Sequence, residues 1–162
     1  MKKIYFFSFL FTISLFILFT LLNSCGDDSV NPQTDYMGGT VTFLDSNVNH
    51  TGGYYAISFY GDSTYPFTKA PILSDSLVIT TSGGVTSAYY KETSLPTGYY
   101  YVAATWVNHS SGNVYALGTY GCDTAANCTS TKITFPSYAG TGALNILSYT
   151  NIYKAIYTYH HP

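Results

Sequence analysis

The stretch that most constrains the fold of this chain is residues 95–107. A Pro-Thr-Gly turn leads there into nine residues that are aromatic, β-branched or small, which is typical of a central β-strand. Alternation along a strand places Trp106 on one face together with Tyr100, Val102 and Ala104. We expect this face, which carries the chain's only tryptophan, to lie in the core.

From residue 38 onward, short strand-like runs alternate with turn signals, and no helical periodicity is present. We therefore predict an all-β fold, and roughly seven to nine strands at this spacing favour a single antiparallel β-sandwich over a small barrel. The last run is either an edge strand or a packed tail. The predicted strands cover residues 40–44, 54–60, 76–81, 87–93, 99–107, 113–119, 132–135, 143–149 and 152–159.

Two short motifs in this region carry a resemblance to a known family. The first is Gly-Thr-Val-Thr-Phe at 39–43, and the second is Leu-Pro-Thr-Gly-Tyr-Tyr at 95–100, followed by small apolar residues in alternation. Together they resemble the carboxypeptidase regulatory-like, transthyretin-like sandwiches of exported bacterial proteins. The resemblance covers about residues 38–150 and implies an Ig-like or transthyretin-like sandwich. The segment 60–74, the cysteine loop and the aromatic tail depart from the family pattern.

The first 24 residues have the pattern of a helical signal peptide, with two lysines after Met1 and an almost wholly apolar run over 4–22. The sequence Leu-Asn-Ser-Cys at 22–25 resembles the lipobox of bacterial lipoproteins, which implies cleavage before Cys25 and its lipidation by acyl chains such as palmitate. The alternative is an uncleaved anchor, because the apolar run is long enough to cross a bilayer as a helix. We predict a signal peptide over 1–24, a lipidated cysteine and flexible tether over 25–37, and the β-sandwich over 38–159.

The charge of the chain excludes one class of partner. Charged residues make up 9% of the sequence, arginine is absent, and the part from Cys25 onward has four lysines against eight acidic residues, a net of about −4. Nucleic acid binding needs clustered lysine and arginine to neutralise phosphates. We therefore expect the membrane, reached through the lipid anchor, and an envelope protein or glycan as partners, and no nucleic acid.

Two further cysteines, Cys122 and Cys128, enclose a five-residue loop. With Cys25 assigned to the lipid, the remaining count is even, and an exported protein meets an oxidising compartment. We predict a disulfide between Cys122 and Cys128, which would stabilise the fold by roughly 2 kcal/mol. A metal site or a redox pair is the alternative, but the spacing is not Cys-x-x-Cys and no nearby histidine completes a ligand set.

The sequence supplies no set of residues that would carry catalysis or bind a metal or cofactor. Gly-Asp-Ser at 61–63 resembles the nucleophile block of SGNH-type hydrolases, but that family is α/β and has a late Asp-x-x-His block, which this chain lacks. The four histidines lie in turns or at the C-terminus, where solvated side chains are the default. We predict no enzyme activity, no metal and no cofactor.

Tyrosine is the compositional outlier, with 18 residues. Strand alternation assigns Tyr54, Tyr60, Tyr99 and Tyr101 to the face opposite the core, where aligned rings stack on sugars or pack against a protein. The alternative is that other elements cover these rings.

We therefore expect a non-enzymatic, lipid-anchored protein of the bacterial envelope, in the outer membrane on its periplasmic or surface face, that serves as a small binding or structural module. A surface glycan-binding module of an uptake system and an accessory subunit of an envelope assembly are the alternatives.

Overall fold

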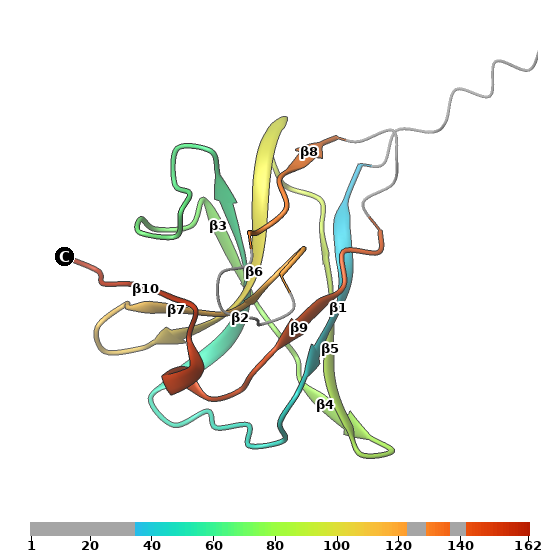
Figure 1. Ribbon diagram of the computed structural model, residues 1–162, viewed down its shortest axis with the longest axis vertical. Coiled ribbons are helices and arrows are strands. Elements are labelled where there is room, and N and C mark those ends of the chain that lie inside the picture. The colour runs from blue at the N-terminus through green and yellow to red at the C-terminus, as the bar shows by residue number, and fades with distance from the viewer. Residues whose placement is uncertain (1–34, 123–128, 137–141) are drawn as a thin grey trace, which may run out of the picture. The chain divides into compact units, whose positions relative to one another are not determined.

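The computed structural model describes residues 35–122, 129–136 and 142–162, all of which belong to one compact unit, Asn31–Pro162 (Figure 1). Within these ranges, no helix is long and apolar enough to cross a membrane. The predicted signal peptide, the lipidated Cys25, most of the tether and Cys128 lie outside the described residues.

The described part of the chain is nearly all β and forms two sheets, so the predicted all-β sandwich is confirmed at that level. The four-stranded sheet has the order β4-β5-β1-β9, and the six-stranded sheet has the order β10-β7-β6-β2-β3, with β8 paired to β6. The elements are β1 (Met37–Phe43), β2 (Gly53–Gly61), β3 (Leu73–Ser76), β4 (Thr80–Ser82), β5 (Val85–Glu92), β6 (Gly98–Asn108), β7 (Val114–Thr119), β8 (Ile133–Phe135), β9 (Ile146–Ser148), the 3-10 helix η1 (Ile152–Lys154) and β10 (Tyr157–Tyr159).

One strand pair departs from the predicted antiparallel pattern. β9 pairs with β1 in parallel, with Val41 opposite Ile146 and Phe43 opposite Ser148. The preceding strand, β8, belongs to the six-stranded sheet, so the chain crosses to the other sheet before β9 and reaches β1 running in the same direction. Parallel strands require such a crossover connection rather than a hairpin. Figure 1 shows β9 beside β1.

β6 is the longest strand and pairs with β2, β7 and β8, which confirms the central strand predicted from residues 95–107. Tyr100, Val102, Ala104 and Trp106 are all buried in the main hydrophobic core, which also confirms their assignment to the core face. The pairing with β2 runs the full length of that strand.

The outer face of the six-stranded sheet has a second, smaller core. Its buried members are Tyr60, Phe67, Ala103 and Ala116, and half-buried tyrosines pack around them. Phe67 belongs to the segment between β2 and β3, so this connection covers the sheet face that alternation assigned to the surface. Both faces of β2 and β6 are therefore buried over much of their length.

Two of the predicted strands are wrong in detail. The run 76–81 is interrupted, because β3 ends at Ser76 in one sheet and β4 begins at Thr80 in the other. Leu77 is buried in this crossing, and its N–H donates to the carbonyl oxygen of Tyr55. The run 152–159 contains η1 and the short strand β10 rather than one continuous strand.

Candidate functional site

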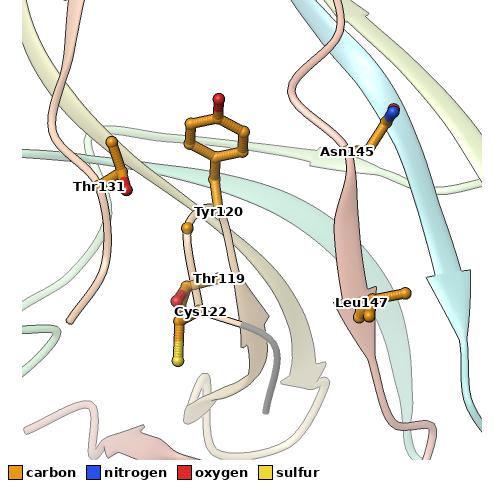
Figure 2. Close-up of a pocket in the computed structure, with 7 residues that line it drawn as sticks. Thr119, Tyr120, Cys122, Thr131, Asn145 and Leu147 are labelled. Carbon is orange, nitrogen blue, oxygen red and sulfur yellow. The ribbon is translucent and has the colours of Figure 1, made fainter. Parts of the chain in front are cut away.

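Two hollows are candidate binding sites on the described surface. The larger has a volume of about 480 Å³ and lies between the end of β7 and strand β9. Figure 2 shows Leu147 on β9 and Asn145 just before it, with Tyr120 and Thr131 on the opposite side. We call it the strand hollow, and its lining residues are Thr119, Tyr120, Gly121, Cys122, Thr131, Asn145 and Leu147.

Polar groups that line the strand hollow are engaged in holding the fold together. The Thr119 hydroxyl accepts a hydrogen bond from Ser130 Oγ at 2.8 Å, and the amide oxygen of Asn145 accepts from the backbone N–H of Thr40 at 3.0 Å. The N–H of Thr131 donates to the carbonyl oxygen of Tyr120 at 2.9 Å. The lining of this hollow contains one aromatic residue, Tyr120, so it offers a ligand little ring surface, and the strand hollow is the weaker candidate.

The second hollow has a volume of about 300 Å³ and lies where the loop between β1 and β2 meets the segment that follows β9. Both segments lie at the lower end of the sandwich in Figure 1. We call this hollow the asparagine groove, and its lining residues are Asn47, Asn49, Thr51, Tyr55, Trp106, Asn151, Ile152 and Tyr153.

The buried part of the asparagine groove is aromatic. Tyr55 on β2 lies opposite Trp106 on β6 in the strand register, and both side chains are largely buried. The Tyr55 hydroxyl donates to the carbonyl oxygen of Thr150 at 2.8 Å and accepts from the N–H of Asn49 at 3.3 Å. Burial raises the pKa of Tyr55, so the phenol stays neutral at physiological pH.

The loops on the two sides of the groove are tied to each other. Oδ1 of Asp45 accepts hydrogen bonds from both the N–H and the hydroxyl of Thr150, each at 2.7 Å. The Tyr55 hydroxyl reaches the same residue through its carbonyl oxygen. Two hydrogen bonds therefore hold the β1–β2 loop directly against the segment after β9, and the Tyr55 hydroxyl on β2 bonds to both segments, so the groove is preformed.

Two asparagines of the groove are held by their amide oxygens. Asn49 Oδ1 accepts from the N–H of Thr51 at 2.8 Å, and Asn151 Oδ1 accepts from the N–H of Tyr153 at 2.9 Å as the N-cap of η1. The structure shows no protein acceptor for either amide nitrogen among the described residues. Because the amide is planar and its oxygen is fixed, each side chain presents an oriented NH2 group.

Gly53 is required by the packing of Trp106. A Cβ at this position would overlap the indole ring and the carbonyl oxygen of Val107. We expect Gly53→Ala to displace Trp106 and to lower the free energy of unfolding by about 1–3 kcal/mol. Urea unfolding and the emission of Trp106, the chain's only tryptophan, measure both effects.

Gly98→Ala is the matched control for this prediction, because the added Cβ there makes ordinary contacts with the Tyr100 ring at 3.6 Å or more. A Gly53→Ala protein that unfolds like the parent, with unchanged emission, would contradict the packing argument.

The four tyrosines predicted as ligand contacts line neither hollow. Tyr60 differs from its predicted exposure, since it is 1% exposed and its ring lies 4.5 Å from that of Phe67. Tyr101 is half-buried and stacks on Tyr65, with ring centroids 3.9 Å apart.

Tyr54 and Tyr99 each lie near the start of a strand, and because β2 and β6 are antiparallel the two tyrosines are at opposite ends of the strand pair. Tyr54 is half-buried, and its ring centroid is 5.4 Å from that of His109. Tyr99 is 53% exposed, and the amine of Lys132 lies 4.9 Å from its ring centroid. Lys132 also pairs with Asp62 at 3.6 Å, with both side chains half-exposed. A role of these tyrosines in binding stays a prediction.

The other residues considered from sequence are placed as follows. Cys122 is buried in the turn after β7, and Cys128 lies outside the described residues, so the disulfide stays a prediction. Ser63 is exposed, and its carbonyl oxygen accepts from the amine of Lys69 at 3.1 Å. No cluster of three or more histidine, cysteine, aspartate or glutamate side chains is found in the described ranges.

Sequence reasoning missed the asparagine groove. The available signal is two asparagines, Asn47 and Asn49, in the ten residues before Gly53, together with Asn151, but each of them fits turn chemistry on its own. Asparagine in a loop is normally a turn or capping residue, and here Asn49 and Asn151 do serve in that way as well.

The described surface offers an aromatic groove with oriented amides, and a larger hollow in which the Thr119 hydroxyl and the Asn145 amide oxygen are engaged in hydrogen bonds within the protein. Comparisons with protein-family models, with curated proteins and with solved structures gave no match.

Proposed function

We propose that this chain is a lipid-anchored protein of the bacterial cell envelope, in the outer membrane on its periplasmic or surface face, whose β-sandwich serves as a small, non-enzymatic binding module. The lipobox-like sequence at 22–25 supports the anchor, with Cys25 as its first mature residue. Several acyl chains on one cysteine provide the multiple hydrophobic signals that stable anchoring needs.

The main support for a binding function is the composition of the asparagine groove. Ligand sites are usually preformed hollows with apolar and aromatic walls and a few fixed polar groups, and the groove has this composition. Its described lining contains no carboxylate, imidazole or amine. General acid–base catalysis relies on such titratable groups, so the lining favours binding by neutral hydrogen bonds and ring contacts.

Substitution of the anchor cysteine tests the proposed location. Cys25→Ser removes the thiol that would be acylated, so we expect the protein to leave the membrane fraction almost completely. Cell fractionation measures this, and the intact mass of the native protein should correspond to an acylated chain that begins at Cys25. Cys122→Ser is the matched control and should stay in the membrane fraction.

Two results would contradict the proposal. An unmodified full-length chain that stays in the membrane after Cys25→Ser would identify residues 4–22 as an uncleaved anchor. Hydrolytic turnover by the purified protein that is lost in Ser63→Ala would contradict a non-enzymatic role.

A second candidate function is an accessory subunit of an envelope assembly. The outer face of the four-stranded sheet exposes Val85, Tyr89 and Leu147, next to the uncharged Thr40 and Thr42, and Lys91 at one end of β5 is its charged residue among these strands. Such a face suits contact with another protein. Mild crosslinking on cells distinguishes the candidates, since a subunit migrates with a defined partner and an independent binding module migrates as a monomer.

A further inference from the structure

We propose that the asparagine groove binds a neutral carbohydrate, through stacking on Tyr153 and hydrogen bonds from the amides of Asn49 and Asn151. This inference rests on the proposed binding function and names the ligand class. Its starting point is Tyr153, which is 92% exposed on η1 at the edge of the groove. The ring of Tyr153 makes no ring contact with a described residue, so its faces are open to a ligand.

The uncharged lining excludes ionic ligands. Phosphates and carboxylates are recognised by arginine or lysine, and hard cations need several carboxylates. The groove offers amides, a threonine hydroxyl, aromatic rings and one isoleucine among its described lining residues. A ligand that fits this lining is neutral and carries many hydrogen-bonding groups next to an apolar surface, and a sugar ring has both.

The amide NH2 groups of Asn49 and Asn151 are suited to donate hydrogen bonds to the hydroxyl groups of a sugar. Each NH2 group is a hydrogen-bond donor, and a sugar hydroxyl accepts such a bond while it donates another. Because Asn49 and Asn151 are already held by their amide oxygens, a ligand does not have to order them. Preorganisation of this kind raises affinity, since less conformational entropy is lost on binding.

The apolar side chains of the groove are suited to the C–H face of a sugar ring. The C–H groups of a pyranose form an apolar surface that packs on an aromatic ring, and Tyr153 supplies such a ring with its hydroxyl free for water. Ile152, half-buried beside it, extends the apolar surface. The volume of about 300 Å³ lies at the lower end for small-molecule sites, which fits a short oligosaccharide segment rather than a protein surface.

Trp106 provides a reporter within the groove. It is the chain's only tryptophan and it lines the groove, so its emission reports on this site and not on the strand hollow. The experiment titrates the full chain in detergent with short neutral oligosaccharides of glucose, mannose, xylose or galactose. We expect at least one series to change the Trp106 emission saturably, with a Kd that calorimetry reproduces.

Variants of Tyr153 locate the ligand. Tyr153→Ala should raise the Kd about tenfold or more, the equivalent of about 1.4 kcal/mol, and Tyr153→Phe should keep the affinity because the ring remains. Tyr89→Ala is the matched control, since this tyrosine is 66% exposed on β5 and lies outside the groove. Equal melting temperatures of the variants would show that the fold is retained.

Asn151→Ser tests the amide separately. Serine is as good an N-cap as asparagine, so η1 is kept while the NH2 donor is lost. We expect the affinity to fall several-fold. Unchanged emission with every oligosaccharide, or affinities that neither Tyr153→Ala nor Asn151→Ser reduces, would overturn the inference. Cell fractionation of Cys25→Ser tests only the membrane anchor, and the oligosaccharide titrations test only the groove. The two experiments therefore distinguish failure of the carbohydrate site from failure of the proposed location.

Discussion

Raising the pH above about 10 destabilises the sandwich progressively and unfolds it at strongly alkaline pH, because two buried phenols have to stay neutral in the folded chain. Burial raises the pKa of Tyr60 and of Tyr90 well above the ordinary value of 10.0. The unfolded chain releases both protons near pH 10 and the folded chain keeps them, so the unfolded state binds fewer protons and stability falls as pH rises. The contribution is fully present below pH 10, and each phenol removes about 1.4 kcal/mol per pH unit above it.

Alkaline titration checks this expectation with two signals. Phenolate absorbance counts the tyrosines that have ionised, and circular dichroism reports whether the sheets persist. We expect two tyrosines to ionise only in the same step in which the sheets are lost. Tyr90→Phe should reduce the pH dependence by one phenol, although it also loses the 2.6 Å bond from the hydroxyl to the carbonyl oxygen of Leu144. Ionisation of all tyrosines near pH 10 with the dichroism unchanged would sink the idea.

Loss of the Phe67 ring should cost about 3–5 kcal/mol of the free energy of unfolding. The ring is 1% exposed and lies between Tyr60, Tyr65 and Tyr157, with centroid distances of 4.5, 5.3 and 5.1 Å. Phe67→Ala removes the centre of this outer core and leaves a cavity that the β2–β3 connection must collapse to fill. The cost is a large fraction of the roughly 5–15 kcal/mol that stabilises a typical domain.

Urea unfolding measures the loss, and Tyr89→Ala serves as the control, because truncation of an exposed ring is expected to change stability by about 0.5 kcal/mol or less. A second signal is specific to the site. Uncovering Tyr60 lowers its pKa towards the ordinary value, so one more tyrosine should ionise before unfolding. A Phe67→Ala protein as stable as the control, with an unchanged alkaline titration, would show that the connection does not cover the sheet.

The alternation of residues along a strand correctly predicted which side chains face the core where one face of the strand packs on it. In β6, the residues assigned to the core are all buried, because the inward face of a central strand is apolar at every second position. The same pattern does not say which sheet a strand joins. Residues 76–81 look like one strand because Leu77 and Ile79 alternate with polar neighbours, yet the chain leaves one sheet and enters the other there.

The candidate site could not be predicted for two physical reasons. Tyr60 follows strand alternation, but a long connection covers its face, and periodicity within a strand carries no information about what packs on top of it. Asn49 and Asn151 are about a hundred residues apart in the sequence and meet only through tertiary contacts such as Asp45 with Thr150. Turn chemistry correctly explains each asparagine alone, and only the fold brings them to one hollow.

The parallel pairing of β1 with β9 makes the asparagine groove depend on the last part of the chain. During synthesis β1 emerges among the first strands, and its second edge remains without a partner until residues 146–148 arrive. The side of the groove formed by Asn151 and Tyr153 follows directly after β9. A chain that ends before β9 therefore lacks both the fourth strand of this sheet and one side of the groove, and a ligand that binds in the groove stabilises only the fully folded chain.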